Sequence, residues 1–207
     1  PEEGALMWSD TLAIPADGES RFKVLDLKTA GSWSWFEGNE IFHVSGAEWQ
    51  ETDLTARALV QAGAAIVHIH ARDPKTGNPT ADIRQIRETI DAIRNRCPEL
   101  IINMSSAIGP GVMAEQRIAP IVAIKPDMAS LNTNTMKLAL VGHNSGNVFN
   151  EIIFENTFKM LVHFATAMKE NGVKPECEVY DFGGIHNVLL VRKQGIFVEP
   201  MHFQLVF

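Results

Sequence analysis

Residues 64–74 read AAIVHIHARDP, and this stretch decides both the fold and the chemistry of the chain. On a β-strand, His68 and His70 project from one face, about 7 Å apart along the strand, while Val67 and Ile69 project from the other. An apolar run that ends in two such histidines is typical of a buried parallel strand whose last residues enter a site. The structural alternative is a pair of hydrogen-bonded core histidines. The pattern favours a zinc site, because imidazole nitrogens are common zinc ligands.

The composition is that of an ordinary globular chain of 207 residues, 45% of them hydrophobic and 21% charged. This length fits one domain with a sizeable core, so we expect a single domain over residues 1–207. The formal net charge of -7 argues against nucleic acid as a partner, because phosphate-binding surfaces are usually basic. A small anionic ligand held by local cations is compatible with this charge.

The cysteines and the N-terminal residues bear on the cellular compartment. Cys97 and Cys177 lack the spacing of a disulfide framework or of a thiolate metal site. The N-terminal PEEGALMWSD does not resemble a signal peptide, and no stretch supplies the ~18 consecutive apolar residues of a membrane span. We therefore expect a cytoplasmic protein that has no membrane partner.

From about residue 52 the chain alternates helical and strand patterns. Isoleucines recur at every third or fourth position over residues 83–93, which predicts a helix. Pro120 is expected to end a helix that begins near residue 112. The expected helices span residues 54–62, 83–93, 112–119, 150–171 and 185–193, and the expected strands span residues 64–70, 100–104, 128–131, 176–180 and 201–206.

Strands that alternate with helices predict a parallel sheet with helical crossovers. Polar residues gather where successive strands end: His68, His70, Ser105, Ser106, Asn132, Tyr180 and Asp181. This pattern favours a (β/α) barrel, whose active site lies at the C-terminal ends of its strands. An open doubly wound sheet also binds ligands there, but the sequence has no G-x-G-x-x-G turn after a first strand.

Four motifs stand in the order and at the spacing of a known family: HIHARDPKTGNP, INMSSAIGPG, KPDMASLNTNT and KPECEVYDFG. Together they resemble the β-keto acid cleavage enzymes, of which 3-keto-5-aminohexanoate cleavage enzyme is typical, over residues 62–207. The resemblance implies a zinc-dependent TIM barrel that is usually a homo-oligomer. It also implies condensation of a β-keto acid with acetyl-CoA as co-substrate, which gives acetoacetate and a new CoA ester.

The resemblance further implies roles for individual residues. His68 and His70 match the two histidine zinc ligands of the family, and Glu178 matches an acidic catalytic residue. Arg72 follows the zinc histidines and is expected to orient them or an anionic substrate. Zinc takes up the negative charge that C–C cleavage beside a ketone builds on oxygen, and a carboxylate moves a proton or holds a ligand in place.

Four more residues match substrate-binding positions: Ser105, Ser106, Ser130 and Asn132. Ser105 falls on the serine that holds the keto acid, Ser106 on its neighbour, and Ser130 on a hydroxyl position beside the substrate. Hydroxyl and amide donors suit carboxylate and keto oxygens. As the structural alternative, the serines satisfy backbone groups at a turn and Asn132 occupies a loop position that asparagine favours anyway.

The resemblance predicts an incomplete barrel. A complete barrel takes about 250 residues, and the run MHFQLVF at residues 201–207 is expected to be strand six. In the family, the third zinc ligand is a glutamate on a late strand, and an aspartate and an arginine of the site lie close to it. These late strands have no counterpart in this sequence. For the first strand, residues 40–48 with Glu48 as a catalytic glutamate compete with residues 22–27, and residues 1–39 are unassigned.

Two other functions fit these residues. A metallohydrolase of the amidohydrolase kind also places His-x-His on a barrel strand, but it needs further histidines and an aspartate on later strands. His186 and His202 do not fall at strand ends and are expected to be structural. The other alternative is a truncated barrel that binds metal weakly and catalyses nothing. Acetoacetate formation from a keto acid and acetyl-CoA distinguishes β-keto acid cleavage from both alternatives.

Overall fold

The computed structural model describes residues 65–73, 79–109, 111–141 and 145–206, together with four N-terminal strands. Those strands are β1 (Thr11–Ala13), β2 (Lys23–Lys28), β3 (Ser32–Glu37) and β4 (Glu40–Ser45). The expected helix over residues 54–62 and the candidate residue Glu48 lie outside the described residues.

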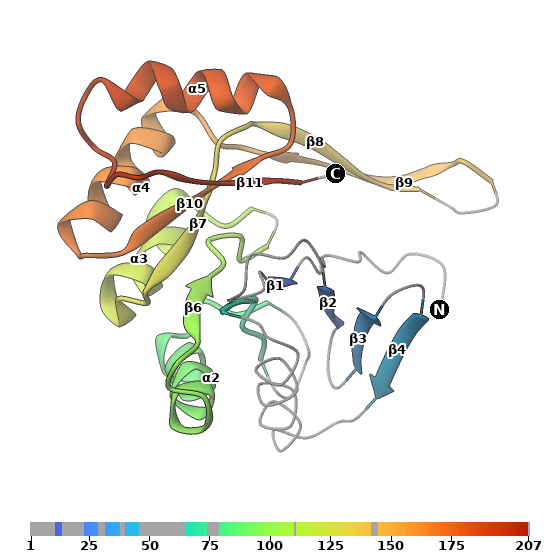
Figure 1. Ribbon diagram of the computed structural model, residues 1–207. Coiled ribbons are helices and arrows are strands. Elements are labelled where there is room, and N and C mark those ends of the chain that lie inside the picture. The colour runs from blue at the N-terminus through green and yellow to red at the C-terminus, as the bar shows by residue number, and fades with distance from the viewer. Residues whose placement is uncertain are drawn as a thin grey trace.

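Five parallel strands form the central sheet (Figure 1). They are β5 (Ile66–Ile69), β6 (Ile101–Met104), β7 (Met128–Asn132), β10 (Lys174–Val179) and β11 (His202–Leu205), and they correspond to the five expected strands. Their spatial order, β11-β10-β7-β6-β5, follows the chain order from one edge to the other. A doubly wound sheet reverses this order at a switch point, whereas a barrel adds each strand beside the previous one. The sheet is therefore that of an incomplete (β/α) barrel.

One face of the sheet is apolar and packs against the helices that connect its strands. These helices are α2 (Ile83–Arg96), α3 (Ala114–Ile124), α4 (Phe158–Glu170) and α5 (Phe182–Arg192). Strand residues such as Ile102 and Leu131 form one buried cluster with residues of all four helices, among them Ile90, Ile121 and Val188. All four helices thus cover the same face of the sheet, as the outer helices of a barrel do.

The predicted helix over residues 83–93 is confirmed in α2. Asp82 caps it, because its carboxylate accepts hydrogen bonds from the N–H groups of Arg84 at 2.8 Å and Gln85 at 3.4 Å. The isoleucine stripe faces the core, with Ile86, Ile90 and Ile93 buried. None of the helices in the described part of the chain is long and apolar enough to cross a bilayer.

The prediction that Pro120 ends a helix was wrong. Pro120 lies inside α3, which continues to Ile124. An interior proline costs a helix one hydrogen bond, but Ile118 and Ile121 on either side are buried in the core. The packing of these isoleucines outweighs the cost of the proline, and tertiary contacts often override helix propensity in this way.

The helix expected over residues 150–171 is shorter than predicted. Thr157 caps α4, since its hydroxyl accepts a hydrogen bond from the N–H of Met160 at 3.3 Å. The preceding residues form β9 (Val148–Phe154), which pairs with β8 (Met136–Val141) in an antiparallel ribbon. The ribbon extends away from the parallel sheet (Figure 1). The apolar stripe of the helix and the apolar residues of the ribbon adjoin in sequence, which is why one element was expected where there are two.

Both candidates for a first barrel strand belong to another sheet. Residues 22–27 overlap β2 and residues 40–48 overlap β4, and both strands pair antiparallel with β3. The four strands form their own sheet in the order β1-β2-β3-β4. Within the described residues, neither candidate hydrogen-bonds to the parallel strands.

The N-terminus of α5 packs closely on the loop that follows β7. Asp181 caps the helix by accepting from the N–H of Gly184 at 3.3 Å, and the side chain of Asn134 donates to the same carboxylate at 2.8 Å. A Cβ on Gly184 would overlap the side-chain oxygens of Thr133 and Asn134. Thr133 in turn donates from its hydroxyl to the carbonyl of Glu178 at 2.7 Å. Glycine at this position therefore allows the ends of β7 and β10 to be joined.

We predict that Gly184→Ala destabilises the protein by about 1–3 kcal/mol, the usual cost of overpacking a tight contact. Thermal or urea unfolding monitored by circular dichroism measures this cost. His186→Ala is the matched control, because His186 lies on the same helix and is exposed. Equal stability of Gly184→Ala and the control would show that the loop of Thr133 and Asn134 moves aside without measurable cost.

Candidate metal centre

The second face of the parallel sheet is polar and buried. Side chains alternate between the two faces of a strand, and the strand register places the polar residues together on the face opposite the helices. The buried members of this face are His68, Asn103, Ser105, Ser130, Asn132, Glu176, Glu178 and Gln204. Buried polar groups are costly unless they find partners, so a face of this composition indicates a site rather than a core.

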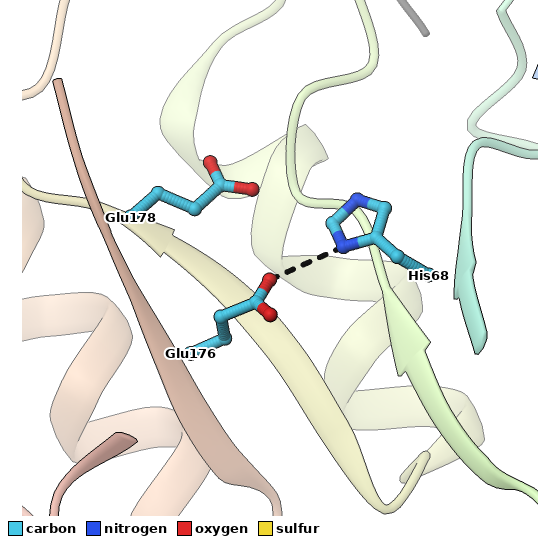
Figure 2. Close-up of side chains that lie close together, drawn as sticks. All are labelled: His68, Glu176 and Glu178. Carbon is cyan, nitrogen blue, oxygen red and sulfur yellow. Dashed lines mark hydrogen bonds and ion pairs between the residues drawn. The ribbon is translucent and has the colours of Figure 1, made fainter. Parts of the chain in front are cut away.

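Three of these side chains converge on one point. The ligand atoms of His68, Glu176 and Glu178 all lie within 4.8 Å of one another. Nδ1 of His68 is 3.2 Å from Oε2 of Glu176, and Figure 2 shows the Glu178 carboxylate beside this pair. His68 and Glu176 are each 2% exposed and Glu178 is 8% exposed. An imidazole and two carboxylates at this spacing form a group that could hold a metal ion.

The convergence requires a curved sheet. His68 is on β5 and both glutamates are on β10, and β6 and β7 lie between these strands. Three strand spacings amount to roughly 14 Å along a sheet, yet the side chains of His68 and Glu176 are in contact. The polar face is therefore concave, as the inside of a barrel is.

The stagger of the strands also matches a barrel. Through Asn103 and Met128, His68 is in hydrogen-bonding register with Lys174. Its contacts are instead with Glu176 and Glu178, two and four residues further along β10. In an eight-stranded barrel of shear 8, residues at the same height along the barrel axis are offset from the hydrogen-bonding register by about one residue per strand, or about three residues over three strands. The position on β10 at the height of His68 therefore falls between Glu176 and Glu178.

Glu176 is held as a carboxylate. Burial would raise its pKa, but the hydrogen bond and charge of His68, the Asn103 amide and the charge of His202 together lower it below the usual value. Nε2 of His202 lies 3.8 Å from the second carboxylate oxygen. Since Glu176 carries no proton to donate, Nδ1 of His68 must carry the hydrogen of their bond. In the neutral form of His68, Nε2 then keeps its lone pair, which is the tautomer a metal ligand needs.

His70 lies directly beside this group. Its ring centroid is 5.0 Å from that of His68. Burial, together with the charges of His68 and Arg72, lowers the pKa of His70 to about 3, against the effect of a hydrogen bond with the Ala107 backbone. His70 is therefore neutral at physiological pH, as a metal-ligating imidazole must be. It is not among the three residues whose ligand atoms converge, so its role as a ligand remains a prediction.

The predicted substrate residues lie close together at the ends of β6 and β7. The N–H of Ser106 donates to Oγ of Ser130 at 2.9 Å, and that hydroxyl donates to Oγ of Ser106 at 3.3 Å. Oγ of Ser105 accepts a hydrogen bond from the N–H of Ala107 at 3.1 Å. The serines thus fix the local turn, as their structural alternative supposed.

Asn132 differs from the serines. It is 3% exposed, and neither its amide nitrogen nor its amide oxygen has a hydrogen-bond partner among the described residues. It stands in register with Glu178 on the neighbouring strand. A buried amide that is left without partners costs about 1–3 kcal/mol, so Asn132 is suited to bind a polar ligand.

Sequence reasoning missed three residues of the site: Asn103, Glu176 and His202. Two glutamates at alternate positions of an apolar strand, Glu176 and Glu178, are themselves a signal of a site. His202 was expected to be structural, but it faces Glu176 from the adjacent strand, with which it is in register. Asn103 occupies the position beside His68.

The fold and the site define an α/β-barrel protein with a buried histidine–carboxylate centre at the ends of its strands. The model of the beta-keto acid cleavage enzyme family matches residues 47–207, and the chain belongs to this family. The match begins after β4, so the antiparallel N-terminal sheet lies outside it.

The chain is similar to curated cleavage enzymes and to a curated acetyl-CoA acetone transferase. The 3-keto-5-aminohexanoate cleavage enzymes of Acetoanaerobium sticklandii and Fusobacterium nucleatum are each 36% identical over 157 residues. These alignments cover 76% of this chain and 53% of each relative. The 3,5-dioxohexanoate:acetyl-CoA acetone transferase of Paraburkholderia graminis is 29% identical over 173 residues, covering 76% of this chain and 55% of that enzyme. The chain thus spans about half the length of the curated relatives it matches.

Solved structures of ObcA share the fold. The binary complex of ObcA with oxaloacetate has a TM-score of 0.60 at 18% identity, covering 80% of this chain and 40% of that one. The ternary complex of ObcA with a C4-CoA adduct and oxalate has a TM-score of 0.57 at 19% identity, covering 80% and 41%. This likeness supports the barrel architecture derived from the strand order.

We predict that the protein, purified without a chelator or a histidine tag, carries a divalent metal ion that elemental analysis detects. His68→Ala should weaken metal binding by at least about tenfold, a loss typical even of residues that only orient a ligand. His163→Ala is the matched control, because His163 is exposed on α4. Unchanged metal content in His68→Ala would contradict the site.

Two further variants distinguish the ligand sets. If His68 and His70 bind the metal together, His70→Ala loses it and Glu178→Gln retains it. If His68 binds it with both carboxylates, the outcomes are reversed. Metal titration of each apoprotein, with folding checked by circular dichroism, measures the difference.

Proposed function

We propose that the protein is a zinc-dependent β-keto acid cleavage enzyme with acetyl-CoA as its co-substrate. In this reaction the acyl group of the keto acid moves to the coenzyme A thiol. Its CH₂–COO⁻ part joins the acetyl group, so that the products are acetoacetate and a new CoA ester. Membership of the family and the acetyl-CoA-dependent relatives support the proposal. The observation that carries it is the buried group of His68, Glu176 and Glu178 on the concave face.

The donor set fits a zinc ion. Imidazole nitrogens and carboxylate oxygens are usual zinc ligands, and the proposed ligands are His68 and His70. Zinc would supply a Lewis acid that takes up the negative charge developing on a keto oxygen. Glu176 fixes the His68 ring from behind, in the carboxylate–histidine arrangement common around metal sites.

Glu178 is proposed to move the proton that the cleavage requires. Its carboxylate lies in the same group as His68 but, unlike Glu176, it is not the partner of Nδ1. The carbonyl of Glu178 is fixed by Thr133, which holds the residue at the end of β10. A positioned carboxylate of this kind serves as a general acid or base.

The remaining candidates are proposed to bind the substrate. The Asn132 amide, buried beside Glu178 in register, would bind a keto or carboxylate oxygen. Ser105, Ser106 and Ser130 line the neighbouring strand ends and would offer hydroxyl groups to the same acid. Arg72 follows β5, and its charge acts on His70, so it would attract the anionic substrate to the metal.

Two further expectations belong to this proposal. The resemblance implies a homo-oligomer, which light scattering at micromolar concentration tests. It also implies action on small molecules; a cytoplasmic location is proposed from the cysteines and the N-terminal residues, and the net charge of -7 argues against a nucleic-acid partner. A monodisperse monomer would contradict the oligomer.

We predict that the zinc-loaded protein converts β-keto acids and acetyl-CoA to acetoacetate. Glu178→Gln should lower kcat by about 10²–10⁴-fold, the usual contribution of general acid–base catalysis, and should leave the metal content unchanged. The assay couples acetoacetate to its reduction and is run over a panel of β-keto acids. Glu170→Gln is the matched control, since Glu170 is exposed on α4.

Other outcomes lead to other functions. Hydrolysis of amides or lactones without acetoacetate formation would favour the amidohydrolase alternative. Bound metal without any turnover would favour a metal-binding barrel that is not a catalyst. Full activity in Glu178→Gln would remove Glu178 from the mechanism while leaving the family's reaction in place.

A further inference from the structure

Arg117 is a buried cation that the proposed chemistry does not use. It lies on α3 and is 3% exposed. Burial lowers its pKa to about 10, and the charge of Glu178 partly opposes this effect. The side chain is therefore charged at neutral pH. Burying a charge costs several kcal/mol unless it is well coordinated, so the contacts of Arg117 must offset this cost.

Each nitrogen of the guanidinium group donates a hydrogen bond to a different acceptor. Nε donates to the carbonyl of Ser106 at 3.0 Å, Nη1 to the carbonyl of Glu155 at 3.1 Å, and Nη2 to Oδ1 of Asn156 at 2.9 Å. All three acceptors are neutral. Among the ion pairs of the described residues, none includes Arg117.

Two aromatic rings complete the environment of Arg117. Its Cζ atom is 4.9 Å from the ring centroid of Phe154 and 5.2 Å from that of Phe164. A guanidinium group over aromatic faces is stabilised by cation–π attraction. Phe154 ends β9 and Phe164 is on α4, so Arg117 contacts three parts of the fold: the turn after β6, residues 154–156 and α4.

The contact with Ser106 reaches the candidate substrate residues. The carbonyl of Ser106 accepts from Arg117, and its N–H donates to Oγ of Ser130. Ser106 is therefore held by hydrogen bonds at both its N–H and its carbonyl, and Ser106 and Ser130 are fully buried. We propose that Arg117 is a positioning residue, which fixes the Ser105–Ser106 turn and, through it, the Ser130 hydroxyl in the geometry that binds the keto acid.

The chemistry of arginine suits this role. A guanidinium group presents several donors in a rigid plane, whereas the ammonium of lysine is a point charge on a flexible stem. Three acceptors from two segments, the turn at Ser106 and residues 155–156, need the planar group. The part of this inference that concerns the keto acid rests on the proposed function, while the fixing of the turn does not.

The first test is amide hydrogen exchange of the loop that contains Ser106 and Ala107. Arg117→Met should speed exchange of this loop by at least about tenfold, the loss expected for a hydrogen bond from a charged donor. Exchange in the core of α4 should rise less, because local opening is separate from global unfolding. Arg87→Met is the matched control, since Arg87 is exposed and donates to the carbonyl of Ala123.

An unchanged loop, or an equal rise in the loop and in α4, would overturn the inference, because the role of Arg117 would then be absent or merely structural. If Arg117→Met does not fold, Arg117→Lys carries the test. It keeps the charge but cannot reach all three acceptors, so it should also loosen the loop.

The second test measures binding of acetoacetate by calorimetry in the metal-loaded protein. Arg117→Met and Ser130→Ala should each weaken binding by about tenfold, and the double variant should be little worse than either, since both act through the same link. Additive losses would overturn the link. If the unmodified protein binds no keto acid, the proposed function fails, while the exchange experiment still decides the role of Arg117.

Discussion

The contact between His68 and Glu176 is the constraint on which the rest of the site depends. Its two residues come from strands that are separated by two others, so it forms only if the sheet curls with the polar face inside. The apolar face must then lie outside, and there the four helices cover it. The contact thus fixes the direction of curvature, and with it the placement of His70, Ser130 and Asn132, which share the inner face.

Burial gives this inner face its chemical character. A carboxylate as deeply buried as Glu176 remains charged only because His68, Asn103 and His202 lower its pKa. Each of these residues is polar and faces inward, so the site stabilises a charge that a core could not hold. The same burial lowers the pKa of His70 and keeps that ring neutral. One carboxylate is therefore held charged and one imidazole of the same face uncharged, which are the protonation states that metal ligands of these types need.

The sequence predicted the parts of this arrangement that repeat along the chain. Strand and helix periodicity located the five parallel strands, and the polar strand ends indicated the barrel and the position of its site. Periodicity could not separate β9 from α4, because both are apolar and adjacent, and it could not show that β2 and β4 pair with β3. Nor could it show that Glu176 meets His68, since that contact depends on the curvature and stagger of strands remote in sequence. His202 was missed for the same reason.

Two supports of the site are independent of each other. His68 and the glutamates are placed by strands β5 and β10, whose outer faces are locked into the apolar core. Ser105 and Ser106 are placed by the turn that follows β6, and this turn depends on polar contacts, above all that of Ser106 with the buried Arg117. A metal ion needs ligands fixed to within a few tenths of an ångström, which strands provide. Substrate groups vary between members of a family, and loops tolerate such variation better than strands do. The histidine–carboxylate group and the serine turn are therefore open to separate change in this fold, because different forces hold their residues.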